Sequence, residues 1–190
     1  SAAPQWVDAS GGAWNLLSTT TVTSSTEIEI AIPQDAAYDE YAIKIVNVAK
    51  QDGTSFRFRM KVKIDGSYPS GTPYQQGFYG KFINQSGSPG GGGSNGKATV
   101  DEIGDSAAWG MNATLIIPSP TSDYFDKSIW FPQYMFQGNP GSGTDNVYIG
   151  TAGVNVNDTK TNNLTSIVLY NTLGNGSSGT VTWDTGKVKV

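Results

Sequence analysis

The chain of 190 residues is long enough for one domain with a substantial core, and only 15% of its residues are charged, with a net charge of −4. It contains neither cysteine nor histidine, which excludes disulfides, thiolate zinc sites and nucleophiles that need a histidine base. An acidic chain binds phosphate backbones poorly, and no apolar run approaches the roughly 18 residues of a membrane span. We therefore expect no nucleic-acid partner, no membrane insertion, no metal and no cofactor.

Two alternating segments come first along the chain. Isoleucines 28, 30 and 32 share one face of an extended segment, and Glu27 and Glu29 share the other. Residues 41–48 alternate as well, and Val46 and Val48 fall on the face opposite Tyr41, so part of this segment is expected to be covered on both sides. A period of two predicts β-strands.

The third segment, residues 55–64, aligns four cations, and turn signals of the Asp-Gly kind stand before and after it. If this strand neighbours the first, cross-strand ion pairs with Glu27 and Glu29 are expected. No aromatic residue is expected among the cations. We interpret the face as mostly structural, with a ligand or partner surface as the alternative. The four cations are Arg57, Arg59, Lys61 and Lys63.

The rest of the chain contains further short extended segments and no persuasive helical period. Single helical turns could lie at 34–39 and 104–109. About eleven short strands predict an all-β domain over 1–190, a two-sheet sandwich of jelly-roll-like type, with a Gly-rich loop at 87–96. The further strands are expected at 77–84, 98–103, 113–117, 129–137, 146–149, 164–171, 178–184 and 186–190, the last two joined by a hairpin at Asp184-Thr185-Gly186.

One motif in the Gly-rich loop resembles a phosphate-binding loop. Gly91, Gly96 and Lys97 match its spacing, but Ala98 stands where a magnesium-binding Ser or Thr is required. The loop also lacks a preceding apolar strand and a following helix, so no phosphate site is predicted.

Acidic residues offer no specific catalytic pair. Glycoside hydrolysis needs two carboxylates that flank the scissile bond, and turn carboxylates usually cap the backbone or stay solvated. Calcium ligation has no recognisable spacing here, and we predict no catalytic residue and no enzymatic activity. The acids considered are Asp39, Glu40, Asp101, Glu102, Asp105, Asp123 and Asp126 for catalysis, and Asp145, Asn155, Asn157 and Asp158 for calcium.

Aromatic residues in polar, loop-like segments are the richer signal. They can stack on sugar faces, anchor a protein interface, or simply cover one end of a sandwich. The candidate ligand- or partner-binding residues are Tyr68, Tyr74, Tyr79, Tyr124 and Phe125.

Several sequence blocks together resemble a β-rich domain of tail-fibre-like and other structural proteins of tailed bacteriophages. The resemblance runs in order over about residues 5–190, although an arginine usual in the penultimate strand is absent near Val168 and Tyr170, and residues 87–96 and 138–163 are individual to this chain. The blocks are Trp6-Val7, YDEYAIKIVNV (38–48), DGTSFRFRMKVKIDG (52–66), LIIPSPTSDYFDKSIWF (115–131) and LTSIVLYNTLGNGSSGTVTW (164–183).

The resemblance implies a non-enzymatic virion component on the exterior of the particle, and it transfers no binding residues. The first expectation is an adhesion or receptor-binding module of tail-fibre type. The second is a capsid decoration protein (head fibre or cement) on the same fold, favoured by the short stretch that precedes the domain. The third, from another class, is a secreted carbohydrate-binding module or glycosidase domain, which would need a cleft with ordered aromatics and, for catalysis, a carboxylate pair at a workable separation. Expected partners are other virion proteins or a host-surface glycan or receptor, and we expect a homo-oligomer, a trimer by preference, because many aromatics lie in loop-like segments.

Overall fold

The computed structural model describes residues 16–34, 39–49, 56–70, 74–82, 92–95, 98–102, 110–121, 126–137, 147–157, 159, 161–173 and 182–190. These segments contain twelve β-strands and no helix, so none that could cross a membrane. The strands are β1 (Thr19–Thr21), β2 (Glu27–Ala31), β3 (Glu40–Ala49), β4 (Phe56–Ile64), β5 (Tyr74–Phe82), β6 (Gly92–Asn95), β7 (Ala98–Glu102), β8 (Gly110–Pro118), β9 (Lys127–Gln137), β10 (Val147–Val156), β11 (Leu164–Leu173) and β12 (Thr185–Lys189).

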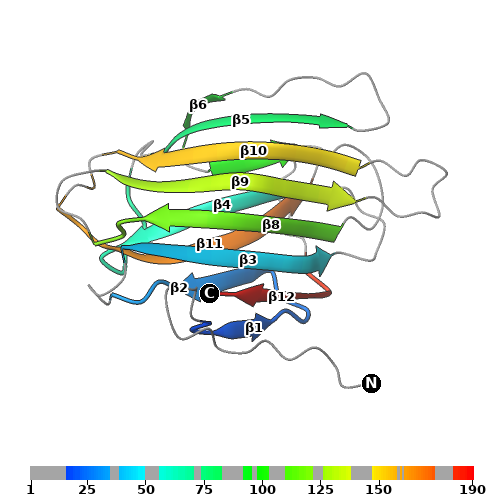
Figure 1. The fold of residues 1–190 in the computed structure, drawn as a ribbon, viewed down its shortest axis with the longest axis horizontal. Helices are drawn as coiled ribbons and strands as arrows, with labels where there is room; N and C mark the ends of the chain where they lie inside the picture. Colours follow the sequence, from blue (N-terminus) through cyan, green and yellow to red (C-terminus); the bar gives the residue numbers. More distant parts are fainter. Residues whose placement is uncertain are drawn as a thin grey trace, which may run out of the picture.

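The strands form two antiparallel sheets that pack face to face (Figure 1). The larger sheet has the order β1-β12-β3-β8-β9-β10-β5-β6, and the smaller has the order β2-β11-β4-β7. The chain passes repeatedly from one sheet to the other, since β2, β4, β7 and β11 belong to the smaller sheet and the intervening strands to the larger. The predicted all-β, two-sheet sandwich is confirmed.

The core lies between the sheets and follows the alternation of the sequence. On the smaller sheet, Ile28 and Ile167 are buried, and on the larger sheet Ile43, Leu115 and Phe131 are buried. Each such side chain stabilises the fold by about 1.5–3 kcal/mol when it leaves water. The other face of each sheet points away from this core, and side chains on these outer faces are available to bind other molecules.

A bulge in β3 corrects one expectation. Val46 and Val48 were expected on one face, but Val46 is exposed whereas Val48 is fully buried. The register between β3 and β8 shifts between Ile45 and Val48, and Asn47 adopts a φ of 48°. Because the extra residue restores Val48 to the core, the strand is not covered on both sides.

The turn after β4 is formed as expected. Asp65 and Gly66 both have positive φ, 48° and 81°, and Ile64 pairs with Ser67 across them. Aspartate and glycine tolerate this backbone region, which suits a tight hairpin turn. The Asp65 carboxylate accepts hydrogen bonds from the Asn163 amide (2.9 Å) and the Asn162 side chain (2.6 Å), which fasten the turn to the start of β11.

The C-terminal segment is arranged differently from the expected hairpin. Trp183 pairs with Ser25, whereas β12 lies between β1 and β3, so both edges of β12 are already used. At residues 184–186 the chain passes from its pairing with Ser25 to the position between β1 and β3, and the two segments do not pair with each other as a hairpin. The larger part of the expected strand 178–184 lies outside the described residues.

Glycine-rich segments hide two strands from sequence-based prediction. β10 runs over Val147–Val156, although only 146–149 was expected to be extended. Gly92–Asn95, within the expected loop 87–96, forms β6 and pairs with Tyr74–Gly77 of β5. The possible helical turn at 104–109 lies outside the described residues, as does all of the turn at 34–39 except its two end residues.

We predict that Gly186→Ala destabilises the fold by about 1–3 kcal/mol. Gly186 has a φ of 141°, and a Cβ there would lie 2.6 Å from the Val48 Cα. The matched control is Gly77→Ala, where a Cβ would meet nothing within 4 Å. Urea unfolding followed by tryptophan fluorescence should show a lower midpoint for the first variant and an unchanged or slightly higher one for the control. Equal midpoints would contradict the close approach.

Candidate functional site

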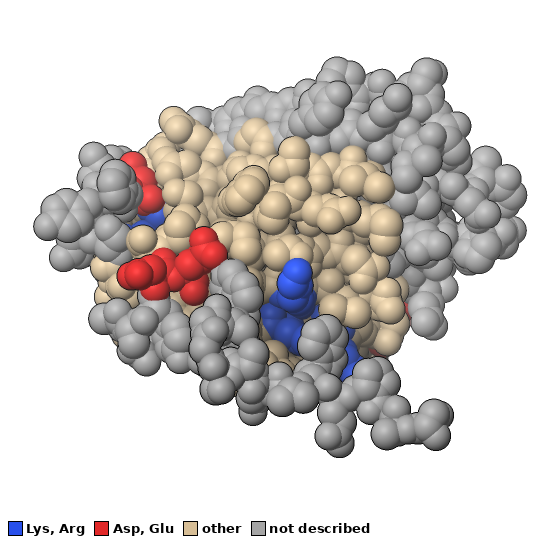
Figure 2. All heavy atoms as spheres, in the orientation of Figure 1, with Lys and Arg blue, Asp and Glu red and all other residues tan. Residues whose placement is uncertain are grey.

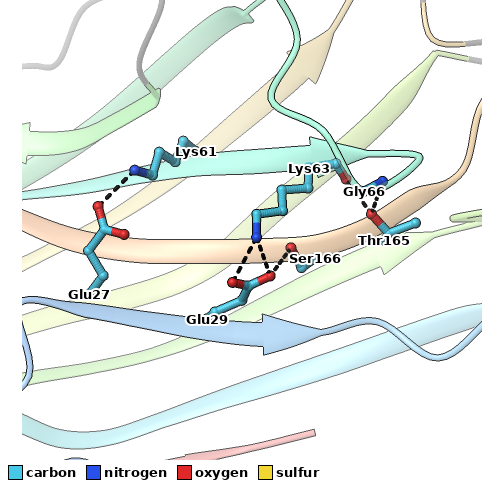
Figure 3. A network of polar contacts seen from close by, with 7 residues as sticks. All are labelled: Glu27, Glu29, Lys61, Lys63, Gly66, Thr165 and Ser166. Carbon is cyan, nitrogen blue, oxygen red and sulfur yellow. Dashed lines mark hydrogen bonds and ion pairs between the residues drawn. The ribbon is translucent and has the colours of Figure 1, made fainter.

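The outer face of the smaller sheet carries a cluster of charges and aromatic rings, which we name the cation surface. In Figure 3 the ammonium groups of Lys61 and Lys63 reach toward two glutamates of β2. Lys61 Nζ lies 2.7 Å from Glu27 Oε1, and Lys63 Nζ lies 2.9 Å from Glu29 Oε1. The cation surface comprises Glu27, Glu29, Arg59, Lys61, Lys63, Tyr68 and Tyr170.

These ion pairs form although β2 and β4 are not neighbours, because β11 lies between them. Val168 of β11 is opposite both Glu29 and Lys61, so the two outer strands are two strand spacings apart, about 10 Å. Long lysine and glutamate side chains span this distance diagonally over β11 (Figure 3). The expected pairing with Glu27 and Glu29 is confirmed for Lys61 and Lys63, but it does not rest on adjacent strands.

Aromatic rings do lie among these cations, contrary to expectation. Lys61 Nζ is 4.6 Å from the centroid of the Tyr68 ring and 5.2 Å from that of Tyr170, and Lys63 Nζ is 5.5 Å from that of Tyr68. Tyr170 is buried on this outer face, as is its neighbour Val168. The lysine stems and glutamates beside this strand thus shield an apolar strip, and the charges are largely satisfied within the surface itself.

The pKa values of these groups follow from the same contacts. Hydrogen bonds from Lys63 and from the Ser166 hydroxyl lower the pKa of Glu29. The hydrogen bond to Glu29 raises the pKa of Lys63. Burial of Lys61 opposes its charged form, but the hydrogen bond and charge of Glu27 outweigh it, and its pKa is raised. Each shift favours the ionised pair, as in a structural network.

The five aromatic candidates from the sequence have different positions. Tyr68 is 47% exposed and belongs to the cation surface. Tyr74 is buried, and its hydroxyl oxygen accepts a hydrogen bond from the Val62 amide (3.1 Å), while burial raises its pKa. Tyr79 is in β5, but its side chain lies outside the described part of the structure. Tyr124 and Phe125 lie outside the described residues altogether. The structure therefore leaves Tyr68 as the one of these with a described, exposed ring.

The described polar side chains at the calcium and carboxylate candidates are engaged locally. Asp126 Oδ1 accepts a hydrogen bond from the backbone N–H of Thr159 (3.0 Å). The side-chain Nδ2 of Asn155 donates a hydrogen bond to Asn157 Oδ1 (3.0 Å). Among the residues that the structure describes, no group of three or more Asp, Glu, His or Cys side chains is placed to hold a metal ion. Asp105, Asp123, Asp145 and Asp158 lie outside the described residues, as do the side chains of Asp101 and Glu102 in β7.

The outer face of the larger sheet has a different character. Figure 2 shows a broad area without charge, with acidic residues to one side and Lys or Arg below it. A shallow groove of about 410 Å³ crosses β5, β10 and β9 on this sheet, beside the exposed ring of Trp130. We name this feature the Trp130 groove. It is lined by Gln75, Gly77, Ser128, Ile129, Trp130, Gly153, Val154 and Asn155.

Strand register explains how the groove is built. Gly153 of β10 is opposite Gly77 of β5 on one side and Trp130 of β9 on the other. In the adjacent outward row, Asn155 is opposite Gln75 and Ser128. The two facing glycines thus leave a bare backbone floor between an indole ring and a row of uncharged polar side chains.

Packing does not require these glycines. A Cβ added at Gly77 or Gly153 would meet nothing within 4 Å, and neither residue has a positive φ. Glycine inside a strand costs about 0.5–1 kcal/mol relative to alanine and often marks a close approach of a ligand or another backbone. The groove is therefore open space that the fold could fill at no steric cost.

The groove was not predicted from the sequence, although the alternation around Trp130 indicated that its side chain points away from the core. Ile129 and Phe131 are buried while Trp130 is 54% exposed, as plain alternation over 129–131 requires. Nothing in the sequence, however, assigned Gly153 to a strand or placed it opposite Gly77.

We predict that Glu29→Gln removes a pH-dependent contribution to stability. Because the pKa of Glu29 is lowered in the folded protein, its contribution is present above the ordinary value of 4.5 and is lost as the pH falls through the folded pKa. The wild type should be slightly more stable than Glu29→Gln from pH 6 to 8, and the difference should shrink below pH 4.5. Chemical denaturation at each pH measures this, with Glu40→Gln, an exposed glutamate in β3, as the control. A difference that persists unchanged at pH 3 would contradict the role of the ion pair.

Comparisons of the chain with protein-family models, with curated proteins and with solved structures found no match. The resemblance to virion proteins of tailed bacteriophages therefore stays a prediction.

Proposed function

We propose that the protein is a non-enzymatic surface protein of a tailed-bacteriophage virion, a tail-fibre-type module that binds a receptor on the host surface. The observation that carries this proposal is the exposed ring of Trp130 beside an open groove on the outer face of the eight-stranded sheet, where every described lining residue is uncharged. A half-exposed tryptophan on a rigid strand is a typical anchor for recognition. The sequence blocks that resemble phage virion proteins supply the virion context.

The contacts of the described carboxylates support binding rather than catalysis. Glu29 pairs with Lys63, Asp65 holds the turn to β11, and Asp126 caps the Thr159 amide. Each of these carboxylates thus has a structural partner, and none faces a second carboxylate across a cleft as glycoside hydrolysis requires.

A capsid decoration protein on the same fold is the second candidate. Leu16, Leu17 and Val46 expose 66%, 41% and 37% of their surfaces, and none of them lines the Trp130 groove. Exposed apolar side chains of this kind are covered in contacts between subunits, which favours docking on other virion proteins or on further copies of this chain. A secreted carbohydrate-binding module is the third candidate, and the Trp130 groove favours it equally.

Binding of the fluorescently labelled full chain distinguishes these candidates. We expect saturable binding to the envelopes of some strains in a panel of bacteria, with no release of sugar from the envelope over hours. Preferential binding to phage capsids would instead select the decoration protein, and binding only to isolated non-bacterial polysaccharide would select the carbohydrate-binding module. The proposal fails if the protein binds no envelope in the panel, or if it depolymerises the polysaccharide.

A further inference from the structure

The Trp130 groove has the chemistry of a sugar-binding site, and we propose that it binds an uncharged pyranose unit of a glycan chain. This inference deepens the proposed function and rests on it for the biological source of the glycan. The binding chemistry itself follows from the groove.

The indole ring provides the first element of recognition. Trp130 lies in the middle of β9, between Ile129 and Phe131, which are both anchored in the core. The strand therefore fixes the backbone position of Trp130 while 54% of the residue stays exposed. A flat aromatic surface on a rigid strand suits the flat C–H face of a pyranose, which an unstructured aromatic side chain would have to be ordered to meet.

The glycine floor provides the second element. Gly77 and Gly153 face each other across β5 and β10, directly in line with Trp130. A side chain at either position would occupy the open space above the sheet, where an added Cβ meets no protein atom. A ring bound against Trp130 can thus lie close to the backbone. The groove volume of about 410 Å³ falls at the small end of the range for ligand pockets, about 300–1,000 Å³.

Polar side chains at one end of the groove provide the third element. Gln75, Asn155 and Ser128 form a row across the same three strands. Amide and hydroxyl groups both donate and accept hydrogen bonds, as sugar hydroxyls do. The Asn155 side chain is already positioned by its hydrogen bond to Asn157 Oδ1 (3.0 Å), which reduces the entropy lost on binding.

Charge selects the class of glycan. The described residues that line the groove carry no charge. An anionic sugar or a phosphate chain would meet no cation among the described lining residues, in contrast to the cation surface on the opposite sheet. A neutral glycan loses least by entering such a site. A flat protein partner would need roughly 800 Å² of complementary surface on its side, and a bare glycine floor gives it few side chains to interlock with.

The direct test measures binding of the full chain to neutral oligosaccharides. Maltohexaose, cellohexaose and chitohexaose serve as first probes, and an array of bacterial glycans, neutral and anionic, extends them. Trp130→Ala removes the stacking surface, Trp130→Tyr retains part of it, and Gly153→Val fills the floor with a side chain that strands accept well. Tyr68→Ala, on the opposite sheet, is the matched control for loss of an exposed aromatic ring.

We expect Trp130→Ala and Gly153→Val each to weaken neutral-glycan binding by tenfold or more. Trp130→Tyr should weaken it less, and Tyr68→Ala should leave it unchanged. The melting temperature of Gly153→Val should stay equal to that of the wild type or rise, because a Cβ at this position meets no atom within 4 Å and valine favours strands. Unchanged binding by both groove variants, binding of anionic glycans alone, or no glycan binding at all would overturn the inference.

Two outcomes separate this inference from the proposed function. Saturable envelope binding that survives Trp130→Ala and Gly153→Val would leave the adhesion function standing and reject the groove. Neutral-glycan binding at the groove without binding to any bacterial envelope would support the sugar site and reject the adhesion function. A change of oligomeric state in Trp130→Ala, seen by light scattering without any glycan binding, would identify the face as a contact between copies and reject the sugar site.

Discussion

Burial of one face of every major strand between two sheets is the constraint on which this structure depends. The period of two in the sequence sends isoleucine, leucine, valine and aromatic side chains into a single layer, which Trp183 helps to fill with no exposed surface. A chain without disulfides relies on this apolar layer for its stability. Once the inner faces are committed to packing, any recognition surface has to be built from the outer faces or the loops.

The outer faces of the two sheets differ in how their charged side chains are arranged. On the smaller sheet, Lys61 and Lys63 cross over β11 to reach Glu27 and Glu29, so that charge is neutralised within the surface and a buried tyrosine and valine are sheltered. On the larger sheet, the strands β9, β10 and β5 carry an open groove whose described lining residues are uncharged, in place of a network of ion pairs. Charges that are paired with one another are typical of a structural surface. An exposed indole beside an open groove is typical of a surface that binds a partner.

Local patterns predicted those features that depend on neighbours in sequence. The strand class and the Asp65-Gly66 turn follow from alternation and turn chemistry. The lysine–glutamate pairs were expected as well, but between adjacent strands, whereas β11 lies between β2 and β4. Features that depend on register between distant strands were not accessible. The groove requires Gly153 to lie opposite both Gly77 and Trp130, and the expected hairpin at 184–186 failed because β1 and β3 occupy both edges of β12. The β3 bulge at Asn47 likewise reverses a side-chain direction that alternation alone assigns wrongly.

The central claim is that recognition takes place on the larger sheet, at Trp130, and not on the cation surface. The most direct measurement follows the indole N–H signals of the five tryptophans by NMR while solubilised envelope glycan from a bound bacterial strain is added. Trp130→Phe assigns its signal by loss of that peak. The account predicts that the Trp130 signal shifts in a saturable manner while that of buried Trp183 stays in place. Saturable binding with an unmoved Trp130 signal, accompanied by shifts of Lys61 or Tyr68 resonances, would contradict it.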